Sequence, residues 1–395
     1  MSRVLFFALF LWLFAAFPAL ANSQVPAAGQ MPFGRQSDLQ EEALSMEEIE
    51  EYIRRLDGEI QKTLPEAGFR DFFEKAVKGE LDFTPASIFQ SISSCVFREV
   101  VANYALLGKL VILAIICAVL YNLTAAFERG TTGQLSSTVV YLVLAGLALG
   151  SFSVALNTGR EAVEKMVSFM QALLPLLLTL LVALGGAASA AILHPVVLGS
   201  LTVIGTITKN VVLPLIFFAA VLGAAGNLSP GFRVSHLAGL LKTVAMGILG
   251  VFGTVFLGIL AIRGVAAGVG DGITLRAAKF AVDAFVPFVG GFFADAFDAI
   301  ISSSLLIKNA AGIAGMVAGL LIMSLPLLKI LALALIYRLA GALVQPVGEG
   351  QVVDCLNDLG SSLLMVFAAV AIVGLLFFFA IAIIVGIGNL TVMIR

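Results

Sequence analysis

Three aspartates, Asp283, Asp295 and Asp298, lie in the most aromatic part of a strongly apolar chain. Asp295 and Asp298 are three residues apart, so a helix places them on one face. Asp283 lies about three turns earlier, before a break predicted at Pro287 and Gly290. A carboxylate at bilayer depth is unfavourable unless it faces protein or water. The spacing therefore indicates a catalytic group, a polar path or a contact between subunits.

One string matches a membrane enzyme: Gly268-Val269-Gly270-Asp271 has the G-x-G-D pattern of intramembrane aspartyl proteases. Those proteases need two aspartates that share a proton to activate water. No Tyr-Asp partner motif occurs in the sequence, and the surrounding stretch 264–272 is predicted to be a glycine-rich loop. Phosphate-binding, H-E-x-x-H and G-x-S-x-G motifs are also missing from the sequence. We therefore expect no enzyme activity, no catalytic residue and no cofactor or metal site.

Lys209 and Asn210 interrupt another apolar run and are followed by Pro214. A lysine at such a position usually pairs with a carboxylate or reaches a water-filled cavity. Two shorter helices with Lys209 at their boundary would explain the same residues, and the sequence leaves both interpretations open. Lys308-Asn309 repeats the pair after a partly similar stretch, which fits either a duplicated broken helix or chance similarity.

The composition predicts an integral membrane protein. Of the 395 residues, 60% are hydrophobic and 12% are charged, and the mean hydropathy is +1.06. Too little polar surface remains to cover a water-soluble globule, and the long apolar runs indicate helices rather than a barrel of strands. Cys95, Cys117 and Cys355 have no disulfide or zinc spacing, and no basic block suggests nucleic acid.

The N-terminal part divides into two predicted segments. Residues 1–21 have the features of a secretory signal peptide with cleavage after Ala21, although an uncleaved anchor is the alternative. Residues 22–103 form an exported acidic helical segment, with 15 of the 25 acidic and 8 of the 23 basic residues. A capping box at residues 45–48 opens a helix with one narrow apolar stripe. That stripe either docks on another subunit or packs on neighbouring residues of its own segment.

Residues 104–395 are predicted to form a multi-pass helical membrane domain, so the fold class is all-α. Seven transmembrane helices are expected, at residues 106–126, 135–156, 171–193, 196–222, 237–262, 310–337 and 361–389. Polar connections are predicted at 160–165 and 338–360. The stretch 280–307 either re-enters the membrane or provides an eighth span, and the distribution of Lys and Arg between loops favours seven.

Small residues form two predicted packing faces. Gly247, Gly250 and Gly258 line one side of the fifth span, and Gly315 and Gly319 line one side of the sixth. Small residues let a neighbouring helix approach closely, so these positions indicate packing rather than chemistry.

Three blocks of sequence carry a resemblance to a known family. They are LHPVVLGSLTVIGTITKN at 193–210, AIRGVAAGVGDGITLRAAKFAVDAFVPFVGGFFADAFDAI at 261–300 and YRLAGALVQPVGEGQVVDCLNDLG at 337–360. With these blocks the chain resembles the stage III sporulation protein AE family of endospore-forming bacteria, from its signal peptide to its C-terminus. The exported acidic segment is the least distinctive part.

The resemblance implies a multi-pass protein of the mother-cell membrane that surrounds the forespore. Its implied partners are the other stage III sporulation A-operon proteins, including the ATPase stage III sporulation protein AA, and stage II sporulation protein Q across the intermembrane space. Together they would form a secretion-like channel, or feeding tube. The leading hypothesis is therefore a non-enzymatic channel or scaffold component in which the three aspartates, Lys209 and Asn210 line a polar path or an interface. The alternative is a secondary transporter that moves a small solute by alternating access.

Overall fold

The computed structural model describes residues 94, 96–126, 131–226, 234–285, 290–346 and 350–394. The side chains of residues 120–126, 131–137, 278–279, 281–285, 290–300 and 394 are outside the described part. All regular secondary structure in the described ranges is helical. The elements are α5 (Tyr104–Ala126), α6 (Thr131–Ala183), α7 (Ala187–Ile207), the π-helix η1 (Thr208–Val212), α8 (Leu213–Gly226), α9 (Ser235–Phe285), α10 (Gly290–Val344) and α11 (Gly350–Ile394).

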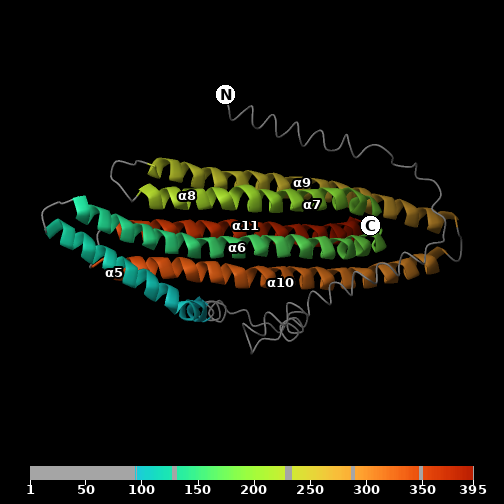
Figure 1. Ribbon diagram of the computed structural model, residues 1–395. Coiled ribbons are helices and arrows are strands. Elements are labelled where there is room, and N and C mark those ends of the chain that lie inside the picture. Colours follow the sequence, from blue (N-terminus) through green and yellow to red (C-terminus); the bar gives the residue numbers. More distant parts are fainter. Residues whose placement is uncertain are drawn as a thin grey trace, which may run out of the picture. The chain divides into compact units, whose positions relative to one another are not determined.

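These helices form a bundle of long rods around α11 (Figure 1). Helix α11 contacts each of the other labelled helices. Its most apolar stretch is 56% buried, the largest buried share among the candidate spans of the described chain. Its sequence explains this position, because no charged residue occurs between Asp358 and Arg395. A helix that is apolar all round is suited to the centre of a membrane protein. The other rods surround it.

Five described helices are long and apolar enough to cross a membrane, and a sixth candidate is the bent pair Val96–Ala102 and Tyr104–Val119. Helices α6 and α10 have 53 and 55 residues, so each is about 80 Å long, more than twice the roughly 30 Å hydrocarbon core of a bilayer. The bundle therefore has membrane-crossing helices, as predicted. Their boundaries differ from the predicted ones.

The largest difference is in α6, which joins two predicted spans into one rod. The prediction of a polar connection at residues 160–165 is wrong, because the helix runs through it without a break. That stretch is Arg-Glu-Ala-Val-Glu-Lys, and its Arg, Glu, Ala and Lys residues have high helix propensity. The chain turns instead within the predicted span 171–193, at Gly185, whose φ of 85° is left-handed and favours glycine.

Two further predicted loops are mostly helical. The glycine-rich stretch 264–272 lies inside α9, where Gly264 and Gly268 pack directly on Ile387 of α11. These glycines permit a close approach of two helices rather than a turn. The predicted polar loop 338–360 is much shorter than expected, because α10 continues to Val344 and α11 begins at Gly350.

The stretch 280–307 does not form an element of its own. Helix α9 ends at Phe285 and α10 begins at Gly290, so the stretch is shared between the ends of two long helices. These ends flank the predicted break at Pro287. The described chain contains five candidate membrane-crossing rods, or six if the bent pair is one span, so the seven or eight predicted spans are not confirmed.

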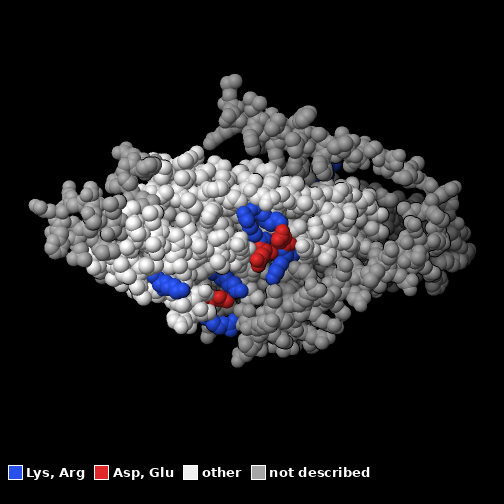
Figure 2. Space-filling model, viewed as in Figure 1, with Lys and Arg blue, Asp and Glu red and all other residues white. Residues whose placement is uncertain are grey.

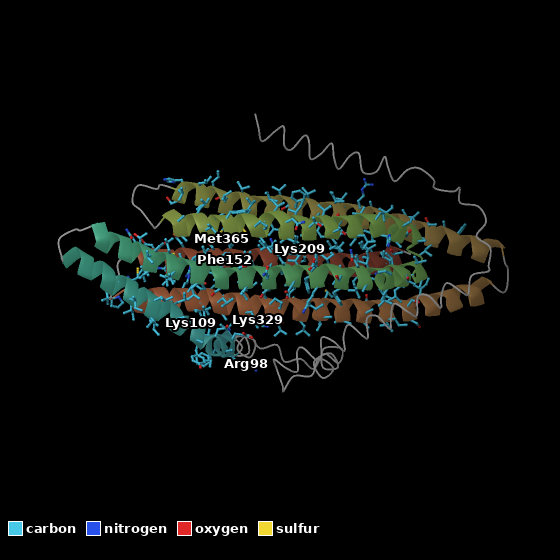
Figure 3. All side chains as sticks on the ribbon, in the orientation of Figure 1. Arg98, Lys109, Phe152, Lys209, Lys329 and Met365 are labelled. Carbon is cyan, nitrogen blue, oxygen red and sulfur yellow. The ribbon has the colours of Figure 1, made fainter. Side chains whose placement is uncertain are left out.

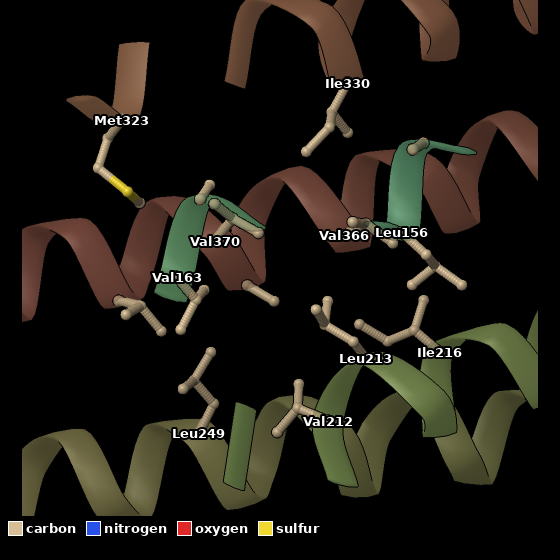
Figure 4. Close-up of a cluster of buried hydrophobic side chains, with 14 of the residues drawn as sticks. Leu156, Val163, Val212, Leu213, Ile216, Leu249, Met323, Ile330, Val366 and Val370 are labelled. Carbon is tan, nitrogen blue, oxygen red and sulfur yellow. The ribbon is translucent and has the colours of Figure 1, made fainter. Parts of the chain in front are cut away.

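Aliphatic side chains from four rods interlock around the middle of α11 (Figure 4). Val366 and Val370 of α11 are fully buried and lie near Ile330 of α10 and Val163 of α6.

Two buried tyrosines also join the rods. The Tyr337 hydroxyl donates to the carbonyl oxygen of Ala148 at 2.6 Å, and the Tyr141 hydroxyl donates to that of Ala224 at 2.7 Å. Because each phenol hydroxyl has a hydrogen-bond partner, its burial leaves no unsatisfied polar group.

Candidate functional site

The most prominent polar site of the described chain lies where α7 and α8 meet, at η1. In this π-helix the backbone N–H of Leu213 donates to the carbonyl of Thr208, five residues earlier instead of four. Pro214 explains the wider turn, because its ring nitrogen cannot donate to the carbonyl four residues earlier, that of Asn210, and its ring crowds that carbonyl. Single π-helical turns of this kind occur frequently at functional sites.

Lys209 leaves η1 on the side of α6 and forms an ion pair with Glu164, its Nζ donating to Oε1. The Lys209 side chain is 25% exposed and that of Glu164 is 62% exposed. Glu164 is the carboxylate partner of the first interpretation, and it comes from the stretch of α6 that was predicted to be a polar connection. Lys209 also lies at the boundary between α7 and α8, as in the second interpretation. Asn210, the next residue, is exposed. We call Lys209, Asn210 and Glu164 the polar crossing.

Further charges surround the polar crossing on the same part of α6. Arg160, Glu161 and Lys165 are exposed, and Figure 2 shows Lys, Arg, Asp and Glu gathered midway along the face, with a second, smaller group of charges to its lower left. Figure 3 places Lys209 at this level, near the middle of the rods. Acyl chains cannot solvate several exposed charges, so this region must face water, headgroups or another protein.

The three predicted aspartates lie at the ends of two helices. Asp283 is in the last turn of α9, and Asp295 and Asp298 are in the first turns of α10. Their side chains are outside the described residues, so their part in a polar path remains a proposal. Along the chain, the three acids are far from the polar crossing.

The main residue missed by sequence reasoning is Lys308, which lies between the predicted stretch 280–307 and the predicted span 310–337. Lys308 lies within α10 and is 0% exposed. Its Nζ donates to the carbonyl oxygens of Ile384 at 3.1 Å and Val385 at 3.0 Å, both in α11. Gly388 provides the space, because a Cβ at this position would overlap the ammonium group. The absence of Pro and of a Gly-rich turn between residues 292 and 311 was the available signal of its helical position.

Asp271 of the G-x-G-D string also has a structural role. It is 5% exposed, and its carboxylate accepts hydrogen bonds from the backbone N–H groups of Ala188 at 3.2 Å and Ser189 at 2.9 Å. These amides lie in the first turn of α7, where unpaired N–H groups and the helix dipole favour a negative charge. The acid therefore joins α9 to the start of α7.

The five predicted packing glycines fall into two groups. A Cβ at Gly315 would lie 2.5 Å from Leu173, and one at Gly319 would lie 2.9 Å from Met166, so both glycines bring α10 against α6. A Cβ at Gly247, Gly250 or Gly258 would have no heavy atom within 4 Å. Within the described chain, that side of α9 has no neighbouring helix.

The polar side chains described above serve pairing and helix packing. Among the described residues, no group of three or more His, Cys, Asp or Glu side chains is placed to hold a metal ion. The polar crossing pairs a cation with a carboxylate, and Lys308 and Asp271 bond to backbone groups. Fold and polar residues together define a polytopic helical membrane protein.

Comparison with known proteins identifies the family. A family profile described as Stage III sporulation protein AE matches residues 67–388. Stage III sporulation protein AE of Bacillus subtilis (strain 168) is 42% identical over 353 residues, which cover 89% of this chain and 88% of that protein. The chain therefore belongs to the Stage III sporulation protein AE family. No solved structure matches the chain.

Proposed function

We propose that this chain is a non-enzymatic membrane component of a channel complex that joins the mother cell to the forespore during endospore formation. The observation that carries the proposal is membership of the Stage III sporulation protein AE family over residues 67–388. The bundle of apolar rods is consistent with a multi-pass membrane protein. Its location would be the mother-cell membrane around the forespore, with residues 22–103 exported after removal of the signal peptide.

The proposed partners are the other stage III sporulation A-operon proteins, including the ATPase stage III sporulation protein AA, and stage II sporulation protein Q across the intermembrane space. The free side of α9 at Gly247, Gly250 and Gly258 supports contact with another membrane subunit, because small residues let helices approach closely. The polar crossing, together with Asp283, Asp295 and Asp298, would line a polar path or an interface.

The direct test is heat-resistant spore titre in a sporulating strain whose own copy is replaced. Deletion should abolish spore formation, and Asp283→Asn/Asp295→Asn/Asp298→Asn should lower the titre more than Glu47→Ala in the exported segment. A normal titre from the triple variant would exclude a role for the acids. A normal titre after deletion would contradict the sporulation function itself.

Localisation and topology need a separate measurement. A fluorescent fusion should gather at the membrane around the forespore. Thiol labelling of single cysteines at positions 283, 295, 308 and 350 in sporulating cells should separate the sides of the membrane. Because Lys308 is buried between α10 and α11, a cysteine at 308 should label least. Strong labelling at 308 would contradict the observed packing.

One observation favours a second function, a secondary transporter. The polar crossing interrupts a long apolar rod with a π-helical turn and a charged pair, as expected of a coupling site. The two functions differ in what the isolated protein can do. A purified chain that moves a small solute across liposomes unaided, and loses this activity in Lys209→Met, would support the transporter and count against the channel component.

A further inference from the structure

The described chain enters the bundle through a short helix that lies at an angle to α5. This helix, Val96–Ala102, meets the Tyr104–Val119 part of α5 at 62°. Asn103 lies between the two pieces, and both its backbone N–H and its side-chain Nδ2 donate to the carbonyl oxygen of Glu99, at 3.1 and 2.8 Å. The two pieces thus have different directions with a hydrogen-bonded junction between them.

The two sides of this junction differ in burial. Val96 is 8% exposed and Val100 packs against the hydrophobic core. On the other side Phe97 is 70% exposed, Val101 51% and Tyr104 72%. Phe97 and Val101 are four residues apart on one face of the short helix, and Tyr104 is the first residue of α5, just beyond the bend. One side of the short helix is therefore held by the bundle, and an apolar, aromatic side is left without a protein neighbour in the described chain.

Three basic residues lie around this exposed side. Arg98 is on the short helix, Lys109 on α5 and Lys329 on α10, which packs against α5, and all three are exposed. Figure 3 labels all three near the start of α5, with Arg98 below Lys109 and Lys329 in this view. Within the described residues, none of these three basic side chains forms an ion pair. Glu99, the neighbour of Arg98 in the sequence, is half-buried.

We propose that Phe97, Val101 and Tyr104 enter the membrane interface while Arg98, Lys109 and Lys329 bind the phosphate groups of anionic phospholipids. An interfacial helix has this arrangement, with an apolar side among the upper acyl chains and basic residues beside the headgroups. Tyrosine is suited to this depth because its ring is apolar and its hydroxyl is polar. Long basic side chains extend towards the phosphates while their methylene groups pack on apolar surface.

The length and composition of α5 favour lipid over a protein partner on this face. Helix α5 has 23 residues, about 35 Å, which is the length of one bilayer crossing. A 62° bend at the end of such a helix is expected where the chain leaves the hydrocarbon core and runs along the surface. The bilayer would then cover the part of the bundle beside α5, with the charged stretch of α6 near the headgroups.

Depth-resolved fluorescence quenching tests the position of the short helix. Full-length protein carrying Trp12→Phe and Phe97→Trp is reconstituted with phospholipids brominated either near the headgroup or near the chain end. The proposal expects stronger quenching by the shallow bromines. Phe218→Trp in α8, where Phe218 is 57% exposed, is the matched control and should be quenched more by the deep bromines. Deep quenching at position 97, or no quenching, would overturn the proposal, and the second result would indicate a protein cover.

The contact of the basic residues with anionic headgroups is tested with the same Phe97→Trp reporter protein in mixtures of brominated phosphatidylglycerol and phosphatidylcholine. The relative association constant should favour phosphatidylglycerol at low salt. Arg98→Gln/Lys109→Gln/Lys329→Gln should lower that preference by about fivefold or more, since each basic residue near an anionic surface contributes appreciably. Arg263→Gln/Arg276→Gln, which removes exposed charges from α9, is the control and should leave the preference unchanged. Equal preferences in both variants would overturn the phosphate contact.

Discussion

The same dipeptide, Lys-Asn, lies in two regions of this molecule with opposite surroundings. Lys209 projects from the π-helix η1 and forms an exposed pair with Glu164. Lys308 lies inside the seam between α10 and α11 and donates to two backbone carbonyls. The first lysine has a carboxylate partner and access to a polar surface, and the second has neither within the described chain.

The comparison shows how each lysine is accommodated. At Lys209 the helix widens by one residue ahead of Pro214, which lets a charged side chain leave an apolar rod towards α6. At Lys308 the neighbouring helix provides the space instead, through Gly388, and its carbonyls replace the hydration of the ammonium group. A buried ammonium group without such acceptors would be strongly unfavourable. Stability should therefore depend strongly on side-chain size in the seam between α10 and α11, and only weakly on side-chain size at the polar crossing.

The largest effect is expected at Gly388. Gly388→Val places a branched side chain where the Lys308 ammonium lies, so it should lower the free energy of unfolding by about 3 kcal/mol. Thermal unfolding of the purified protein in detergent measures this change. Gly386→Val, two residues earlier, is the control, because a Cβ there meets no atom within 4 Å.

Adding Lys308→Met to Gly388→Val should restore part of the lost stability. The shorter, uncharged side chain leaves room for the valine and needs no carbonyl partner. Equal destabilisation with and without Lys308→Met would show that Gly388 is not required by the lysine.

The next largest effect is expected on the small-residue faces. Gly315→Ala inserts a methyl group 2.5 Å from Leu173 and should lower the free energy of unfolding by about 2 kcal/mol. Gly247→Ala has open space and should raise it by up to about 1 kcal/mol, because alanine is the better helix former. If the free side of α9 binds another subunit, Gly247→Ala should nevertheless reduce co-purification of the other stage III sporulation A-operon proteins.

A smaller effect is expected at Asp271. Asp271→Asn keeps one acceptor for the amides of α7 but loses the charge that interacts with the helix dipole, so it should cost about 1 kcal/mol. Thermal unfolding again measures the change. Asp271→Ala should cost more, since it leaves both amides without this acceptor. A fully stable Asp271→Ala variant would mean that the cap contributes nothing.

The smallest effect on stability is expected at the polar crossing. Lys209→Met should change the free energy of unfolding by at most about 1 kcal/mol, because exposed ion pairs contribute little. The same change should still lower spore titre if the crossing forms a polar path or an interface. A large loss of stability would show instead that the ion pair is needed for folding.

Sequence reasoning was most successful for properties that composition controls. The apolar content established a helical membrane protein. Lys209, with Pro214 shortly after it in the sequence, marked a local irregularity that the structure shows as η1. It was least successful for helix boundaries. The charges of residues 160–165 suggest a polar connection between two spans. These residues nevertheless have high helix propensity, and α6 runs through them without a break. The glycines at 264 and 268 look like a turn, yet in α9 they permit contact with α11.

The sequence by itself determined that this chain is an all-helical membrane protein of the Stage III sporulation protein AE family, because hydropathy and family blocks need no knowledge of packing. Only the tertiary structure decided which charges are exposed. Lys308, Lys209 and Asp271 are each flanked by apolar sequence, and their surroundings depend on helices far away in the chain: α11 for the first, α6 for the second and α7 for the third. Burial and pairing are set by those long-range contacts, which local sequence does not encode.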